Sequence, residues 1–201
     1  MSCTLSTALS CPPIHALTIV PHDSNAVDGD YIAYYNSTGH EVHERVMSPD
    51  DLLVERDFAD PADPAGLERR WRDIRPGFFC GCANLMNEVD YVSAISALKA
   101  QYDGSTGRLV VPQGMSAYSI RKSVVAFLCN PQRGAGDAAS SASWSVTEFD
   151  IIKNNIQRQC GYLVPGTWAG SYPTTLAWGY MNWVKGLDFC ERSDEGTPGA
   201  C

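Results

Sequence analysis

Cysteine and histidine, the residue types best suited to disulfide, metal and nucleophilic chemistry, are unevenly distributed along this chain of 201 residues. Six of the eight cysteines follow the pair Arg69-Arg70, and they are Cys80, Cys82, Cys129, Cys160, Cys190 and Cys201. All four histidines precede that pair, and they are His15, His22, His40 and His43. The distribution indicates a precursor whose two parts have different chemistry.

The six cysteines after the dibasic pair are suited to three disulfides, because an even set in a secreted chain can pair within itself. Six cysteines allow 15 pairings. The strain of so small a ring disfavours the three that join Cys80 to Cys82, and the other twelve stay open. A zinc site is the competing use of such residues, but Cys80-Gly81-Cys82 lacks the spacing of a zinc knuckle and no histidine follows it. We therefore expect no metal and no cofactor.

The pair Arg69-Arg70 is itself a candidate processing site. It ends an acidic, proline-rich stretch, Asp60 to Glu68, which cannot bury enough apolar surface to fold and is therefore accessible to a secretory-pathway protease. Cleavage after Arg70 would start the mature chain at Trp71. The alternative is an uncut surface pair within one intact domain.

Charge is divided at the same place. Residues 17–70 carry 12 acidic and 4 basic side chains, whereas residues 71–201 carry 11 of each, so the net charge of -8 belongs to the first part. A neutral second part lacks the basic surface that would attract nucleic acids or anionic lipids, so we expect neither as a partner. No run approaches the roughly 20 apolar residues that a membrane span requires.

Residues 1–16 have features of a signal peptide, with apolar residues around Leu5 to Leu9 and a small residue at Ala16. Removal of this segment would also remove Cys3 and Cys11 and leave the even set of six. Two alternatives are a wrongly placed start codon and an N-terminus that belongs to the fold, since no basic residue precedes Arg45.

The first part of the chain carries two further signals. Asn36-Ser37-Thr38 is an acceptor for N-glycosylation. A strand is predicted at residues 31–35, and it is either isolated or paired with the sheet of the second part as a folding aid or mask. These features predict a secreted, extracellular protein with a signal peptide (1–16), an acidic pro-segment (17–70) and a mature cysteine-rich domain (71–201).

A chain that begins at Trp71 contains no histidine, so Ser-His-Asp triads, Cys-His dyads and histidine-ligated metal centres all lack a required residue. An uncut chain would still contain His40 and His43, which we expect to be solvated on a polar loop. A carboxylate pair for glycoside cleavage remains available, and its candidate members are Glu88, Asp90, Asp103, Asp137, Glu148, Asp150 and Asp188. Most of these acids have a simpler role in a helix start or a turn, so we predict no catalytic residue.

Aromatic residues concentrate between Tyr162 and Trp183. Alternation along a strand would place Trp178 and Tyr180 on one face and Trp183 on the other. Such residues either fill the core or form a surface that stacks on sugars or anchors a protein. The candidate binding residues are Trp168, Tyr172, Trp178 and Tyr180. Trp168, in a loop bounded by glycine and proline, is the best candidate for exposure.

The elements that must position these residues follow from caps and periodicity. Ser145 to Glu148 forms a capping box, apolar residues follow at spacings of three and four up to Cys160, and Gly161 supplies the stop. A second helix is predicted from Glu88 to Tyr102. Further strands are predicted at residues 108–111, 123–129, 176–184 and 187–190. The order predicts an α+β fold, a compact disulfide-stabilised sandwich of two helices on an antiparallel sheet, to which a disulfide at Cys160 would fasten its helix.

Five short motifs follow one another between residues 78 and 190, and they are Met115 to Tyr118, Val124 to Asn130, the helix ending Gln159-Cys160-Gly161, Gly179-Tyr180 and Phe189-Cys190. In order and spacing they resemble the small cysteine-rich proteins secreted by filamentous fungi, and are most similar to killer-toxin-like and necrosis-inducing effector-type domains. The resemblance implies a disulfide-held α/β fold, a signal peptide, a pro-region ending in a dibasic site, and action as a toxin or host-directed effector without a known catalytic centre.

The sequence leaves three classes of function open. The expected one is a secreted effector or toxin, a monomer that binds a cell-surface protein of a host or competitor. A cell-wall glycan-binding protein would instead use exposed tryptophan and tyrosine. A carboxylate-dependent glycosidase would need two acids about 5 to 10 Å apart in a cleft.

Overall fold

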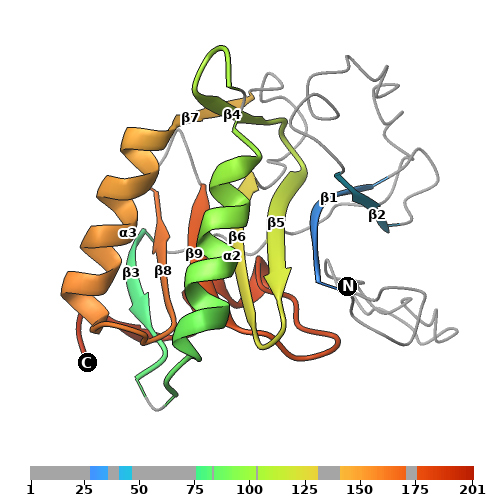
Figure 1. Ribbon diagram of the computed structural model, residues 1–201. Helices are drawn as coiled ribbons and strands as arrows, with labels where there is room; N and C mark the ends of the chain where they lie inside the picture. Colours follow the sequence, from blue (N-terminus) through green and yellow to red (C-terminus); the bar gives the residue numbers. More distant parts are fainter. Residues whose placement is uncertain are drawn as a thin grey trace, which may run out of the picture.

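The computed structural model describes residues 28–35, 41–46, 76–82, 84–102, 104–130, 141–170 and 176–201. Two helices lie over one face of an eight-stranded antiparallel sheet, and a separate two-stranded sheet lies near one end of the helices (Figure 1). The strand order of the large sheet is β10-β3-β8-β9-β6-β5-β1-β2. Several neighbouring strands, such as β10 and β3 or β5 and β1, come from distant parts of the chain, which makes the sheet the element that holds those parts together.

The strands of the large sheet are β1 (Gly29–Tyr35), β2 (Glu41–Arg45), β3 (Gly77–Cys80), β5 (Met115–Arg121), β6 (Val124–Asn130), β8 (Gly166–Ala169), β9 (Ala177–Asn182) and β10 (Thr197–Pro198). The small sheet pairs β4 (Arg108–Val111) with β7 (Ala142–Ser145). The helices are α2 (Glu88–Ala100) and α3 (Val146–Cys160), and η1 (Glu191–Asp194) is a 3-10 helix.

Strand β6 lies inside the large sheet, between β5 and β9. All seven of its residues are buried, as its nearly continuous apolar sequence predicts. Ala126 and Leu128 pack in the core beneath the helices, whereas Val125 and Phe127 pack in a second core on the opposite face. The predicted strand at residues 123–129 is confirmed with a shift of one residue, and both faces of the sheet are covered.

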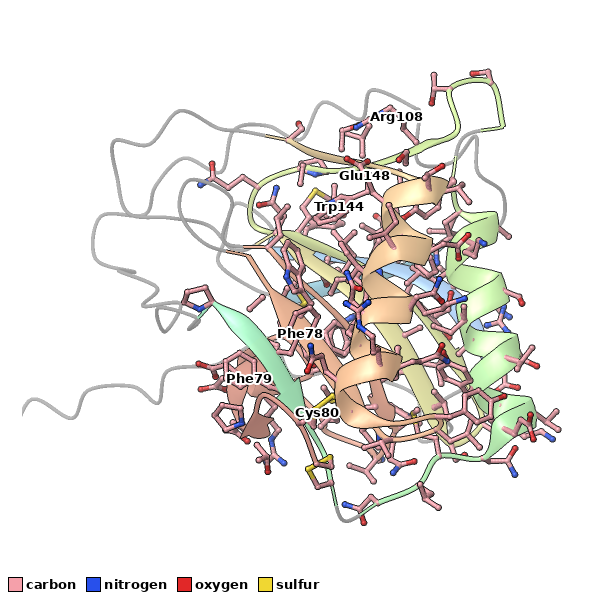
Figure 2. All side chains as sticks on the ribbon, turned by 90° about the vertical axis from the view of Figure 1, so that its left-hand side faces the viewer. Phe78, Phe79, Cys80, Arg108, Trp144 and Glu148 are labelled. Atoms are coloured by element: carbon pink, nitrogen blue, oxygen red, sulfur yellow. A yellow bond between two sulfur atoms is a disulfide. The ribbon has the colours of Figure 1, made fainter. Side chains whose placement is uncertain are left out.

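The same alternation divides β3 between the two cores. Phe78 packs against the core on the helix side, and Phe79 is buried in the core on the other side (Figure 2). In β9, Trp178 and Tyr180 lie on the helix side, whereas Met181 packs against the opposite core. The predicted alternation of β9 is therefore confirmed.

Helix α3 begins and ends where the capping residues predict. The Ser145 hydroxyl accepts a hydrogen bond from the Glu148 amide, and the Glu148 carboxylate accepts one from the Ser145 amide, at 3.2 and 2.7 Å. At the other end Gly161 has a φ of 104°, a conformation that disfavours other residues. Four residues of the predicted stripe are buried, and they are Phe149, Ile152, Ile156 and Cys160. This helix is confirmed.

Helix α2 lies over β5 and β6, while α3 lies over β3 and β8. The side chain of Asn87 caps α2 by accepting a hydrogen bond from the Asp90 amide. The helix ends at Ala100, two residues before the predicted end at Tyr102, whose buried ring packs edge-on against Phe149. The predicted helix is confirmed except for its last turn.

The segment from Leu187 to Cys190 covers the face of the sheet opposite the helices. The prediction of a strand there is wrong, because Leu187, Phe189 and Cys190 all pack into the second core instead of alternating. The Phe189 ring lies 4.7 Å from that of Phe127 and 5.1 Å from that of Tyr118. A short irregular segment thus provides the layer that buries the second face of the sheet.

The described residues contain three disulfides, which join Cys80 to Cys160, Cys82 to Cys201, and Cys129 to Cys190. The first fastens the last residue of α3 to β3, as the sequence predicts for Cys160. The third fastens the central strand β6 to the segment that covers the second core. Both layers around the sheet are therefore held to it covalently.

The chain before Arg70 contributes two strands to the large sheet. The predicted strand at residues 31–35 is confirmed as part of β1, and of its two possible arrangements it adopts pairing with the main sheet, through β5. β2 follows and pairs with β1 on its outer side. The sheet is thus continuous across the division suggested by charge and by the dibasic pair.

The α+β class, the antiparallel sheet, the two helices and the disulfides agree with the prediction. The large sheet is larger than expected, because five of its strands were not predicted. Those strands are β2, β3, β5, β8 and β10, and β7 of the small sheet was not predicted either. With eight strands in one sheet, the protein is mostly sheet rather than a small sandwich of helices on strands.

Glu148→Gln should weaken the start of α3 in a pH-dependent way. Hydrogen bonds from the Ser145 amide and hydroxyl, with a smaller contribution from Arg108, hold the pKa of the Glu148 carboxyl below its ordinary value. A depressed carboxyl pKa stabilises the fold above the ordinary carboxyl pKa, and this contribution is lost as the pH falls through the depressed value. Denaturant titrations should show a loss of about 0.3–1 kcal/mol at pH 7.

At a pH below the depressed pKa, Glu148→Gln and the parent should have the same free energy of unfolding. Glu195→Gln is the control, because its carboxylate makes only a 3.8 Å ion pair with Arg192. An equal loss of stability from Glu148→Gln at pH 7 and at strongly acidic pH would contradict the role of the charged form.

Candidate binding surface

The acids that could have formed a glycosidase pair have structural partners wherever they are described. The Asp150 carboxylate accepts hydrogen bonds from Lys99 Nζ at 2.9 and 3.0 Å. The Asp90 carboxylate is buried and accepts a hydrogen bond from the Ser123 hydroxyl at 2.7 Å, which ties the start of α2 to the turn before β6.

The remaining acids have similar roles. Asp188 accepts a hydrogen bond from the Glu191 amide at the start of η1, and Glu88 accepts one from the Tyr162 hydroxyl at 2.8 Å. Asp103 and Asp137 lie outside the described residues. The simpler roles expected of Glu88, Asp90 and Glu148 in first helical turns agree with the structure.

Trp178 and Tyr180, two of the four candidate binding residues, are core residues. Both side chains are 0% exposed, because β9 turns this face toward the two helices. An aromatic ring stacks on a sugar or a partner only if one face is accessible. Their assignment to an exposed binding surface is therefore corrected, and the core interpretation of the aromatic cluster holds for both.

The buried aromatics form a chain that joins the helices to β9. The Trp178 ring lies 4.6 Å from that of Phe149 in α3, and the Tyr180 ring lies 5.0 Å from that of Tyr91 in α2. Gln157 donates a hydrogen bond to the Tyr91 hydroxyl at 2.9 Å. Burial raises the pKa of Tyr91 to about 12 and also raises that of Tyr180. Both phenols therefore stay protonated near neutral pH, in keeping with a structural role.

Trp168 lies in strand β8, so the loop predicted around it is wrong. The Gly166-Thr167-Trp168-Ala169 sequence pairs with β3 on one side and β9 on the other. Its ring is partly buried, packs against the helix-side core and lies edge-on to Trp144 at 5.6 Å. Trp168 is the only one of the four candidates that is both described and partly exposed.

Four other predicted site residues lie outside the described part of the chain. They are Tyr172, the glycosylation acceptor Asn36, and the processing pair Arg69 and Arg70. Among the histidines, His43 is described. It lies in β2, partly buried, and its Nδ1 is 2.8 Å from the Tyr118 hydroxyl, so the expected solvated loop position is wrong.

Four exposed apolar side chains gather at the start of α2, and we call this group the α2 patch: Leu85, Val89, Val92 and Tyr162. Their exposed fractions are 73%, 69%, 49% and 55%. Val89 and Val92 are three residues apart and therefore lie side by side on the outer face of the helix. Apolar side chains with such exposure on one helix face are typical of a contact surface.

Two contacts between backbone segments hold the α2 patch together. The Met86 amide donates a hydrogen bond to the Leu163 carbonyl at 2.8 Å, which places Leu85 near the turn that carries Tyr162. The Tyr162 hydroxyl donates to Glu88 at the start of α2. The patch is thus formed by two segments of the chain. Each segment follows one cysteine of the same disulfide, because Leu85 comes shortly after Cys80 and Tyr162 shortly after Cys160.

The sequence contained a signal for this surface. The predicted stripe of α2 comprises Tyr91, Ile95, Leu98 and Tyr102, whereas Val92 falls on its flank and Val89 on the opposite side of the helix. A helix with apolar residues on both faces either lies between two layers or presents one face for contact. Tyr162 could not be placed beside them from sequence, because that neighbourhood depends on the packing of α3.

Comparison with protein-family models, curated proteins and solved structures found no match. In the described part of the chain, no three histidine, cysteine or acidic side chains are arranged to hold a metal ion. Within the same residues no helix is long and apolar enough to cross a membrane.

Trp178→Ala should destabilise the fold, and Leu85→Ala should not. Removal of the buried Trp178 ring leaves a cavity between β9 and α3, so the free energy of unfolding should fall by about 3–5 kcal/mol. Truncation of the exposed Leu85 side chain should lower the free energy of unfolding by less than about 0.5 kcal/mol. Urea titrations under non-reducing conditions measure both. Equal effects of the two substitutions would mean that Trp178 is not a core residue.

Proposed function

We propose that this chain is a secreted, cysteine-rich effector or killer-toxin-like protein that acts by binding a cell-surface protein of a host or competitor. The three disulfides support an extracellular site of action, because such bonds persist in oxidising compartments. The motifs between residues 78 and 190 and the predicted processing after Arg70 support membership of that class of secreted protein.

The α2 patch is the observation that carries the proposal of binding. Leu85, just before α2, and Val89 and Val92 on the helix expose aliphatic side chains, and Tyr162 is held at the start of the same helix by its hydrogen bond to Glu88. The helix itself is fixed to the sheet by its contacts with β5 and β6. Such a preorganised apolar surface with an aromatic anchor suits a protein partner, because little conformational entropy is lost when it is covered.

Binding is favoured over catalysis by the state of the polar side chains. The described acids cap helices or pair with Lys99, Ser123 and Tyr162. A glycosidase pair would need two carboxylates facing a substrate across a cleft, with one of them held protonated. Each described carboxylate among the candidate acids has a local partner, which favours a structural role.

A glycan-binding function is the second candidate, and Trp168 is the residue that supports it. Sugars stack on flat aromatic faces rather than on branched aliphatic side chains, so the α2 patch suits them poorly. Trp168 is held edge-on by Trp144 and packs against the core, which reduces the area it can offer. We therefore place this function second.

Binding to cells should depend on the α2 patch. The double variant Leu85→Ser with Val92→Ser should bind at least tenfold more weakly to plant or yeast cells than the parent protein, since a few central residues carry most interface energy. The control variant Val110→Ser with Ile151→Ser removes exposed apolar side chains elsewhere. Flow cytometry with fluorescently labelled protein measures saturable binding.

Treatment of the cells distinguishes the two functions. Protease treatment should abolish binding if the partner is a protein. Binding that survives protease but is lost after chitinase or glucanase, and that Trp168→Ala reduces, would favour the glycan instead. An α2-patch variant that binds as the parent does would contradict the proposed surface.

Intact mass spectrometry of the protein secreted by its own producer should test the processing. We expect a chain that starts at Trp71 and carries three disulfides, which reduction would show as a gain of six hydrogens. A start well upstream of Trp71 would contradict cleavage after Arg70, and the same spectrum reports any glycan on Asn36.

A further inference from the structure

The β1–β2 hairpin contacts the remainder of the described chain along most of the edge of β5. β1 pairs with β5 from Gly29 opposite Ile120 to Ala33 opposite Ser116. Ile32 is buried in the core beneath the helices and Ala33 in the opposite core, so the hairpin contributes to both layers. Its loss would expose apolar surface on both faces and unpair the backbone groups of β5 on the edge that faces β1.

A charged residue of the hairpin is bound within this contact. The Asp30 carboxylate accepts hydrogen bonds from Arg121 at 2.9 Å and from the Ser119 hydroxyl at 2.6 Å. Gln101, at the end of α2, donates to Ser119 Oγ at 3.0 Å. The network therefore runs from β1 through β5 to the helix layer, and removal of Asp30 would leave Arg121 without this carboxylate.

Contacts of the hairpin continue on the opposite face of the sheet. The Tyr31 ring stacks on that of Tyr118 with centroids 5.1 Å apart, and His43 approaches the Tyr118 hydroxyl. At the turn before β6, the Lys122 amide donates to the Asp28 carboxylate at 2.6 Å. The start of the hairpin and both of its faces thus have partners in the sequence that follows the dibasic pair.

We infer that residues 28–46 are a permanent subunit of the folded protein rather than a discarded pro-segment. When the chain is cut between Val46 and Pro76, as after Arg70, the hairpin stays on β5 as a second chain held without a covalent bond. The three disulfides of the described chain join residues from Cys80 onward, so none of them links the hairpin to the larger fragment. The strand pairing, the two cores and the Asp30 network hold the hairpin.

Retention changes the chemistry available to the cut protein. The chain that begins at Trp71 has no histidine, but the two-chain protein keeps His43 against the buried Tyr118. It also keeps acidic side chains of the first part, including Asp30. The inference adds to the proposed processing, and an engineered cut tests it whether or not the natural chain is cleaved.

The test uses the full chain with a site-specific protease sequence inserted between Arg70 and Trp71. After cleavage and size-exclusion chromatography in native buffer, the fragment that contains residues 28–46 should elute with the fragment that contains the three disulfides. Denaturant should separate them. Elution of the two fragments as separate peaks in native buffer would overturn the inference.

Asp30→Asn and Asp150→Asn form a matched pair of variants for the strength of the contact. Both remove a carboxylate that binds a basic side chain, but only Asp30 lies between the hairpin and β5. After cleavage and dilution, Asp30→Asn should release the hairpin about 10 to 100 times faster than the parent, whereas Asp150→Asn should not. Circular dichroism of the uncut variants confirms folding, and equal release from Asp30→Asn and the parent would contradict the assigned role of the network.

Discussion

Burial of the large sheet on both faces is the constraint on which the rest of the structure depends. Because β6 has apolar side chains on both sides, two separate layers must cover it. The helices form one layer, and the irregular segment around Phe189 forms the other. Each layer is fastened to the sheet by its own disulfide, through Cys160 and Cys190. Stability therefore depends on elements from both ends of the second part of the chain.

Sequence reasoning succeeded where a local signal was complete. The capping box at Ser145 and the apolar run of β6 each determine their element without help from distant residues. Sequence patterns failed for short strands such as β3 and β8, whose four residues show no alternation of polar and apolar types and which depend on neighbours far away in the chain. Leu187 to Cys190 has the composition of a strand, but tertiary packing takes all its apolar side chains to one side.

The candidate site illustrates the same division. Sequence composition located the aromatic cluster but could not tell that β9 turns Trp178 and Tyr180 inward, because the choice of face depends on where the helices lie. Conversely, the sequence shows that Val89 and Val92 lie outside the buried stripe of α2. Only the fold brings Tyr162 to the start of this helix. The two aromatic residues of β9 thus lie in the interior, while the surface available for contact combines aliphatic side chains with Tyr162.

The two disulfides that start at Cys80 and Cys82 differ in their access to solvent. Cys80 and Cys160 are 1% and 3% exposed, whereas Cys82 and Cys201 lie at the surface. A thiol in the surroundings would therefore attack the second bond first, and β10, a strand of only two residues, would lose its covalent anchor while both cores remained closed. The C-terminal segment is consequently the part of the sheet whose attachment can report the redox state of the medium.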